Sequence, residues 1–221
     1  MKQRYPVVQP SQAAAPVLNA DALVLAGGRS RRMRTPKASL PINGVAMIEY
    51  VLRVVGPIFR RTLVVARPET ELPRLEAKVI FDQYPGRGPL AGLISGLQAT
   101  TTRWCFAIGC DMPFLESEVI RFMGAQLEGA EVVAVRASGR IQPLHAFYHR
   151  DCLDRGESLL REGVGSLMAL HARCQVKVLD EAEFTCEGRL QRSIWDLDTP
   201  AEYAAALAGC APVLPPTLRS R

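Results

Sequence analysis

The chain has 221 residues, of which 48% are hydrophobic and 22% charged, and its formal net charge is +5. This length and composition are those of a single globular domain with a full hydrophobic core. Such a domain does not require disulfides or a structural metal ion for its stability. The charge is too mild to choose between a nucleotide, a nucleic acid and a membrane surface as partner. No apolar run approaches the roughly 20 residues of a membrane helix, so no membrane contact is expected.

The two ends of the chain differ from its centre. Residues 1–19 contain three prolines among Gln and Ala and are predicted to form a flexible arm; residues 210–221 are predicted to form a loose tail. Residues 20–209 form the expected single domain. No continuous apolar stretch of a secretory signal is present, which predicts a cytoplasmic location. The six cysteines match no zinc spacing and are expected to be reduced thiols, mostly buried.

Apolar segments of strand and helix type alternate through the central part. In chain order we predict strand 22–26, helix 47–55, strands 63–66 and 79–81, helix 89–97, strand 104–109, helix 116–127, strands 132–135 and 144–148, helices 152–160 and 166–171, strands 176–179 and 193–197, and helix 200–208. This alternation predicts a three-layer α/β fold, a mostly parallel sheet with helices on both faces. Ligands of such folds bind outside the carboxyl ends of the strands.

The first predicted strand ends in the sequence Leu25-Ala26-Gly27-Gly28, and a basic loop follows it. Paired glycines allow backbone N–H groups to approach a phosphate closely. Four arginines and Lys37 lie within the next residues, and such cations match phosphate oxygens. A solvated basic loop or a nucleic-acid patch would look similar. The position directly after the first strand favours a phosphate-binding loop.

Acidic residues follow three other predicted strands. Asp82 precedes a Gly-Pro-rich helix start at Gly88 and Pro89, although a simple turn explains this aspartate as well. Asp111 ends the apolar strand 104–109, where burial is unfavourable unless the carboxylate binds a cation, and Mg²⁺ held by carboxylates and substrate phosphates is the usual arrangement. Asp196 and Asp198 would face the same side of a strand and supply one further metal ligand, whereas Thr199 before Pro200 is a natural helix cap.

Together these segments resemble the molybdenum cofactor guanylyltransferases, a MobA-like family of nucleotidyltransferases. The resemblance covers about residues 20–208, and five motifs occur in the family order: Leu25-Ala26-Gly27-Gly28 with Arg32, Met33 and Lys37; Asp82 with Gly88-Pro89-Leu90-Ala91-Gly92; Cys110-Asp111-Met112-Pro113-Phe114; Gln142-Pro143-Leu144; and Asp196-x-Asp198-Thr199-Pro200.

The resemblance implies a nucleotide-diphospho-sugar transferase (Rossmann-like) domain that transfers GMP from GTP to molybdenum-molybdopterin and releases pyrophosphate. The family roles would make Lys37 and Asp111 catalytic and would place Mg²⁺ on Asp111 and Asp198. The GTP-binding set would be Leu25, Ala26, Gly27, Gly28, Arg32, Lys37, Asp82, Gly88 and Pro89. The resemblance also implies transient contact with cofactor-insertion proteins or molybdoenzymes, and no nucleic acid or membrane partner.

Several alternatives stay open. The Ala-Gly-Gly of the first loop is typical of the guanylyl arm of the family, but Asp196-x-Asp198 resembles the cytidylyl arm, so CTP is the alternative nucleotide. Arg34 stands where the family usually has glycine, and no pterin-gripping arginine is evident near Gly165, so another phosphorylated acceptor stays open. A non-catalytic nucleotide-binding protein would not need Lys37 and Asp111. A nucleic-acid binder would be expected to interleave aromatic residues with its basic ones.

Overall fold

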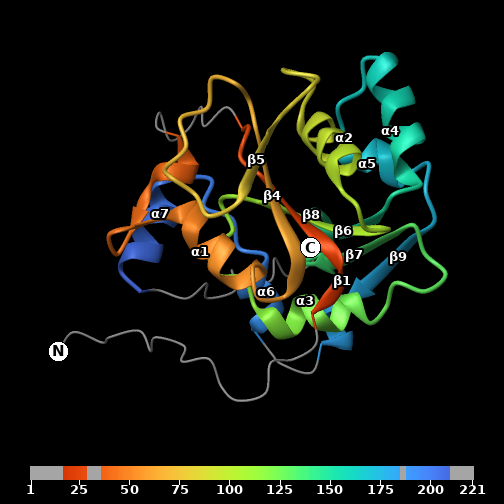
Figure 1. Cartoon of the computed structure of the whole chain (residues 1–221). Coiled ribbons are helices and arrows are strands. Elements are labelled where there is room, and N and C mark those ends of the chain that lie inside the picture. The colour runs from red at the N-terminus through yellow and green to blue at the C-terminus, as the bar shows by residue number, and fades with distance from the viewer. Residues whose placement is uncertain (1–16, 29–35, 185–187, 210–221) are drawn as a thin grey trace, which may run out of the picture.

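A central seven-stranded sheet organises the protein. The computed structural model describes residues 17–28, 36–184 and 188–209. The strands lie in the order β5-β4-β1-β6-β8-β7-β9 (Figure 1). Their bounds are β1 Leu18–Leu25, β4 Phe59–Ala66, β5 Lys78–Phe81, β6 Trp104–Gly109, β7 Val132–Ala137, β8 Arg140–His149 and β9 Val176–Asp180.

The sheet is mostly parallel, as predicted. β1 pairs in parallel with β4 and β6, β4 with β5, and β7 with β9, while β8 is antiparallel to both of its neighbours. Leu25 at the end of β1 is in register with Val65 of β4 and Gly109 of β6. The carboxyl ends of these central strands therefore meet at one edge of the sheet.

Helices cover both faces of the sheet (Figure 1). One face carries α2 (Pro89–Ala99), α4 (Cys152–Arg161) and α5 (Leu167–His171). The other face carries α1 (Met47–Val55), α3 (Ser117–Gly124) and α6 (Arg189–Ser193). In β1, Leu23 packs into the first layer, and Ala22 and Val24 pack into the second, because side chains alternate along a strand.

A third, smaller cluster lies beside α1. The hairpin of β2 (Pro41–Ile42) and β3 (Val45–Ala46) packs there with α7 (Pro200–Leu207), around buried Met47 and Leu197. Two short 3-10 helices, η1 (Lys37–Ser39) and η2 (Glu181–Glu183), complete the described elements.

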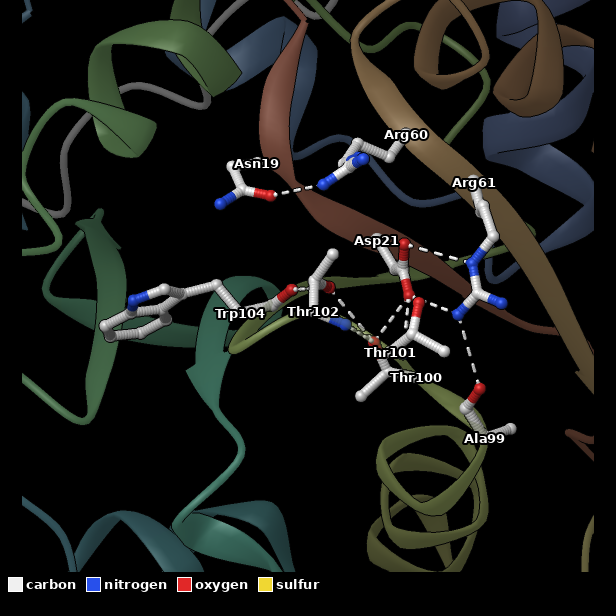
Figure 2. A network of polar contacts seen from close by, with 9 residues as sticks. All are labelled: Asn19, Asp21, Arg60, Arg61, Ala99, Thr100, Thr101, Thr102 and Trp104. Carbon is white, nitrogen blue, oxygen red and sulfur yellow. Dashed lines mark hydrogen bonds and ion pairs between the residues drawn. The ribbon is translucent and has the colours of Figure 1, made fainter.

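A buried carboxylate ties the amino ends of the central strands to the end of α2 (Figure 2). Asp21 of β1 is fully buried and accepts a hydrogen bond from Arg61 Nη2 at 2.7 Å. It also accepts one from Thr100 Oγ1 at 2.6 Å and one from the Thr101 backbone N–H at 3.2 Å. Burial alone would raise the pKa of Asp21, but these donors outweigh it and lower the pKa. This network is structural and lies at the sheet edge opposite the carboxyl ends.

The structure corrects the element predictions at particular places. The predicted strand 193–197 is wrong: Ser193 ends α6, and Trp195 to Asp198 form no strand. Its apolar residues pack beside the sheet, where Leu197 is buried near α1 and α7 and Trp195 stacks on Phe114. The predicted helix 116–127 is shorter and forms α3. The predicted strands 22–26, 63–66 and 144–148 belong to the longer β1, β4 and β8, each of which begins four residues earlier than predicted.

Two further points concern the termini and the membrane. β1 begins at Leu18, so the last two residues of the predicted arm belong to the sheet, and residues 1–16 and 210–221 lie outside the described part. Within that part, each helix is too short or too polar to cross a bilayer.

Candidate nucleotide site

A cleft of about 590 Å³ opens at the carboxyl ends of β1, β4, β5 and β6. This is the position at which parallel α/β sheets bind their ligands, because the strand-to-helix loops diverge there. Ten of the eleven predicted site residues line it: Leu25, Ala26, Gly27, Gly28, Lys37, Asp82, Gly88, Pro89, Asp111 and Asp198. The eleventh, Arg32, lies outside the described residues, as does most of the predicted basic loop.

Lys37 joins two carboxylates from distant parts of the chain. Its Nζ donates a hydrogen bond to Asp111 Oδ2 at 2.8 Å, and a second one to Asp198 Oδ1. Asp111 follows β6, whose end is fixed by the hydrogen bond from Cys110 N–H to Leu25 O. The segment with Asp198 is held by the bond from Leu197 N–H to Asp111 O at 3.0 Å. The sequence predicted that the Asp111 carboxylate binds a cation, and in the structure Lys37 supplies one.

The cluster is more buried than exposed, and it concentrates charge. The Lys37 side chain is only 13% exposed. Burial alone would lower its pKa, but Asp111 and then Asp198 outweigh this, and the pKa of Lys37 is raised. Burial also raises the pKa of nearby Asp196 to about 6, with the Asp198 and Asp111 carboxylates adding to the shift. The Lys37 ammonium thus bridges two carboxylates at the cleft.

The residues could accept a divalent metal ion, but only with help from a ligand. In the described ranges, no group of three or more His, Cys, Asp and Glu side chains is placed to hold a metal. Asp111 and Asp198 nevertheless both contact the Lys37 ammonium, so their carboxylates lie close together. Carboxylate oxygens are the ligands that Mg²⁺ prefers. Two carboxylates completed by substrate phosphates therefore fit Mg²⁺.

Asp198 reaches this position from a connecting segment. The argument that Asp196 and Asp198 face one side of a strand is wrong, because no strand forms there. The expected cap is confirmed: the Thr199 side chain accepts a hydrogen bond from Glu202 N–H at the start of α7. Asp198 and Thr199 thus have separate roles, one toward the cleft and one in the helix.

The glycine loop forms the cleft wall at the end of β1. Ala26 N–H donates to Val65 O at 2.8 Å, which fixes the strand up to this residue. A methyl group added at Gly27 would lie 3.4 Å from Arg67 Cγ, and one added at Gly28 would meet no atom of the described residues within 4 Å. The described part of the protein therefore has space for alanine at both positions, and the missing side chains leave room in the cleft.

The corner at Asp82 is shaped by packing as well as by turn chemistry. Asp82 Oδ1 accepts from Tyr84 N–H at 2.9 Å and from Ser95 Oγ at 3.3 Å, which is the turn role considered above. Gly88 has a φ of +78°, and a side chain there would lie 2.8 Å from Gly165 O. Glycine at 88 is thus required by the close approach of the α4–α5 linker, and Pro89 then begins α2.

Sequence reasoning missed Arg67 and Thr70, which also line the cleft. Arg67 directly follows β4, and its side chain is 16% exposed. The rule that ligand-binding residues follow the strand ends would have found it. Arg67 adds a second cation beside Gly27, next to the loop that is expected to hold the nucleotide.

Comparisons with known proteins agree with this geometry. The family model described as "MobA-like NTP transferase domain" matches residues 22–176. A probable molybdenum cofactor guanylyltransferase of Pelotomaculum thermopropionicum is 31% identical over 190 residues, which are 86% of this chain and 93% of that protein. Its counterpart in Bacillus cytotoxicus is 32% identical over 193 residues, 84% and 94% of the two chains.

Solved structures show the same fold. Molybdopterin-guanine dinucleotide biosynthesis protein A of Archaeoglobus fulgidus superposes with a TM-score of 0.76 at 26% identity, over 86% of this chain and 98% of that one. A 2-C-methyl-D-erythritol 4-phosphate cytidylyltransferase of Thermus thermophilus gives 0.65 at 14% identity, over 84% and 96%, which indicates the fold alone. The chain therefore belongs to the family of MobA-like NTP transferase domains, whose nucleotidyltransferase fold the predicted motifs also indicated.

Proposed function

We propose that the protein is a molybdenum cofactor guanylyltransferase, which transfers GMP from GTP to molybdenum-molybdopterin and releases pyrophosphate. The observation that carries the proposal is the Lys37 ammonium held between Asp111 and Asp198 in a cleft walled by Gly27 and Gly28. Two relatives named as probable molybdenum cofactor guanylyltransferases support the acceptor and the nucleotide, and the family match supports nucleotidyl transfer.

The reaction is an in-line displacement. The phosphate of molybdopterin attacks the α-phosphorus of GTP, a new P–O bond forms, and the bond to the β-phosphate oxygen breaks as pyrophosphate leaves. Such transfers depend on positioning and charge neutralisation rather than on a protein nucleophile. The backbone at Gly27 and Gly28 would hold the phosphates, and Lys37 would neutralise charge on them.

Asp111 and Asp198 would hold Mg²⁺ together with substrate phosphates. When bound, the ion would neutralise the negative charge that develops on the triphosphate during transfer. The chain's own contribution is a pair of carboxylates brought to one point by the Leu197–Asp111 backbone bond. The Mg²⁺ dependence and a cytoplasmic location stay predictions.

One assay tests the proposal. Pyrophosphate release is measured with GTP, CTP, ATP and UTP, each with and without molybdenum-molybdopterin and each with and without Mg²⁺. The expected result is release with GTP that requires both the acceptor and Mg²⁺. Binding of GTP without release under any condition would instead favour a non-catalytic nucleotide-binding protein.

CTP is the second candidate nucleotide, because Asp196-x-Asp198 resembles the cytidylyl arm of the family. Preferential release with CTP and the same acceptor would make the protein a cytidylyltransferase. Release with GTP only when another phosphorylated acceptor replaces molybdopterin would retain the reaction class and change the acceptor.

A further inference from the structure

Two cysteines lie side by side at the sheet edge opposite the cleft. Cys152 is the first residue of α4, and Cys174 lies in the bend between α5 and β9. Their Sγ atoms are 3.6 Å apart. A disulfide needs about 2.05 Å between the sulfurs, so rotation of the side chains with a small shift of the bend would bring them within bonding reach.

The two thiols have different surroundings. Cys152 is fully buried, and its Sγ lies 3.5 Å from Glu131 O, whereas Cys174 is partly exposed. Arg155 lies beside the pair and is held by Glu131 Oε1 at 2.7 Å. Cys174 is thus the thiol that a solution reagent reaches first, and Cys152 is shielded behind it.

The electrostatics agree with this order. The Cys152 thiol as hydrogen-bond partner lowers the pKa of Cys174, burial opposes this, and the Arg155 guanidinium adds to the lowering. The same hydrogen bond, followed by burial, raises the pKa of Cys152. A thiolate at Cys174 is the nucleophile in thiol–disulfide exchange.

We propose that Cys152 and Cys174 form a redox pair that low-molecular-weight disulfides, of the glutathione disulfide type, convert to an intramolecular disulfide. Cys174 attacks one sulfur of the reagent, the reagent's S–S bond breaks, and its first thiolate leaves and takes up a proton. Cys152 then gives its proton to solvent and attacks the Cys174 sulfur, so the second reagent thiol leaves. Two protein thiols are oxidised, and one reagent disulfide is reduced to two thiols.

The disulfide would link the start of α4 to the segment that follows α5. At the other end of this pair, Gly165 O accepts a hydrogen bond from Leu90 N–H at 3.2 Å, beside the Gly88 corner of the cleft. Cross-linking residues 22 apart in sequence restricts the unfolded chain, and the chain-entropy account predicts a rise in melting temperature of roughly 7–13 °C for a protein of this size.

The test uses full-length protein with Cys186→Ser and Cys210→Ser, since those two cysteines lie outside the described residues and would complicate assignment. The protein is incubated with glutathione disulfide and analysed by intact mass, non-reducing peptide mapping and thermal melting. We expect the loss of two hydrogen masses, a peptide linking Cys152 to Cys174, and a higher melting temperature that dithiothreitol reverses.

Two further variants in this background make the result decisive. With Cys152→Ser, Cys174 should keep one glutathionyl group, because no thiol resolves the mixed disulfide. With Cys174→Ser, buried Cys152 should stay unmodified. Stable glutathionylation of Cys174 with Cys152 present, or no reaction of either thiol while the protein is folded, would overturn the proposal. A linked peptide containing Cys105 or Cys110 instead would also overturn it.

Discussion

At the scale of single residues, Lys37 joins the most distant parts of the site, because its ammonium bridges Asp111 and Asp198. Replacing it with alanine removes this cation from the position where the triphosphate is expected. Charge-assisted hydrogen bonds contribute roughly 1.5–3 kcal/mol, so Lys37→Ala should weaken GTP binding about 10- to 100-fold. Guanosine binding should change little. Calorimetry with both ligands measures this, and exposed Lys78→Ala on β5 is the control. Equal loss for GTP and guanosine would remove Lys37 from the phosphate site.

Asp111 supplies the second prediction at this scale. Asp111→Asn keeps the shape of the side chain, and the backbone bond from Leu197 N–H to the residue 111 carbonyl remains available. The fold should therefore survive, while pyrophosphate release at saturating Mg²⁺ should fall at least about 100-fold. Asp154→Asn, an exposed position on α4, is the matched control and should retain wild-type turnover. A variant that turns over at nearly the wild-type rate would show that Asp111 does not hold the metal.

At the scale of elements, the end of β1 should decide the choice of base. Alanine at Gly27 would contact Arg67 Cγ at 3.4 Å and otherwise project into the cleft wall, so the variant should fold. We expect wild type to prefer GTP and Gly27→Ala to shift the kcat/KM ratio toward CTP about tenfold or more, because the added methyl group narrows a purine-sized slot. Gly28→Ala adds a methyl group that meets no atom of the described residues within 4 Å, and it should leave the ratio of kcat/KM for GTP and CTP unchanged.

Two outcomes would contradict this account of base choice. If wild type prefers CTP, the Ala26-Gly27-Gly28 argument fails and the Asp196-x-Asp198 resemblance prevails. If Gly27→Ala leaves the ratio unchanged, the base is read elsewhere. Asp82, which lines the same cleft, is then the next residue to vary.

The same scale shows how far the sequence predicts this protein. Strand-to-helix alternation is local, so β6 was predicted with its observed bounds and α2 to within two residues, whereas β1 begins four residues before its predicted start. Because the carboxyl ends of parallel strands meet at one edge of the sheet, the motifs that follow these strands could be predicted to share one cleft. The strand predicted for residues 193–197 was wrong, because a short alternation of apolar and polar residues also fits a segment that packs its apolar side chains beside α7. The Lys37 contacts span 74 and 161 residues, and no local pattern specifies which carboxylates a lysine will reach.

At the scale of the whole molecule, the two layers each contain a buried neutral histidine. His145 lies under one face, with Nε2 2.7 Å from Ser193 Oγ and its ring edge-on to Phe106. His171 lies under the other face, with Nε2 2.9 Å from Tyr148 Oη. Burial lowers the pKa of each histidine to about 4. Protonating either histidine therefore lowers the free energy of unfolding of the whole domain.

This burial makes stability depend on pH. An unfolded histidine titrates near 6.5, so between about pH 6.5 and 4 the unfolded chain binds protons that the folded chain does not. The free energy of unfolding should therefore fall as the pH drops through this window, by on the order of 3 kcal/mol for each histidine. Asp196 opposes the trend, because its raised pKa of about 6 lets the folded state take up a proton there.

His171→Gln isolates one contribution, since Tyr148 O–H donates to Pro143 O, and the glutamine amide can still donate a hydrogen bond to Tyr148 Oη but does not titrate. His145 is the poorer choice, because its partner Ser193 Oγ also accepts a hydrogen bond from Glu116 N–H at 3.0 Å, so two contacts would change together. Urea unfolding at pH 8 measures the packing effect of His171→Gln alone. On lowering the pH to 4.5, the free energy of unfolding should fall less for the variant than for wild type. The value for the variant minus the value for wild type should therefore be larger at pH 4.5 than at pH 8. A gap that stays constant from pH 8 to 4.5 would mean that His171 is protonated in the folded protein.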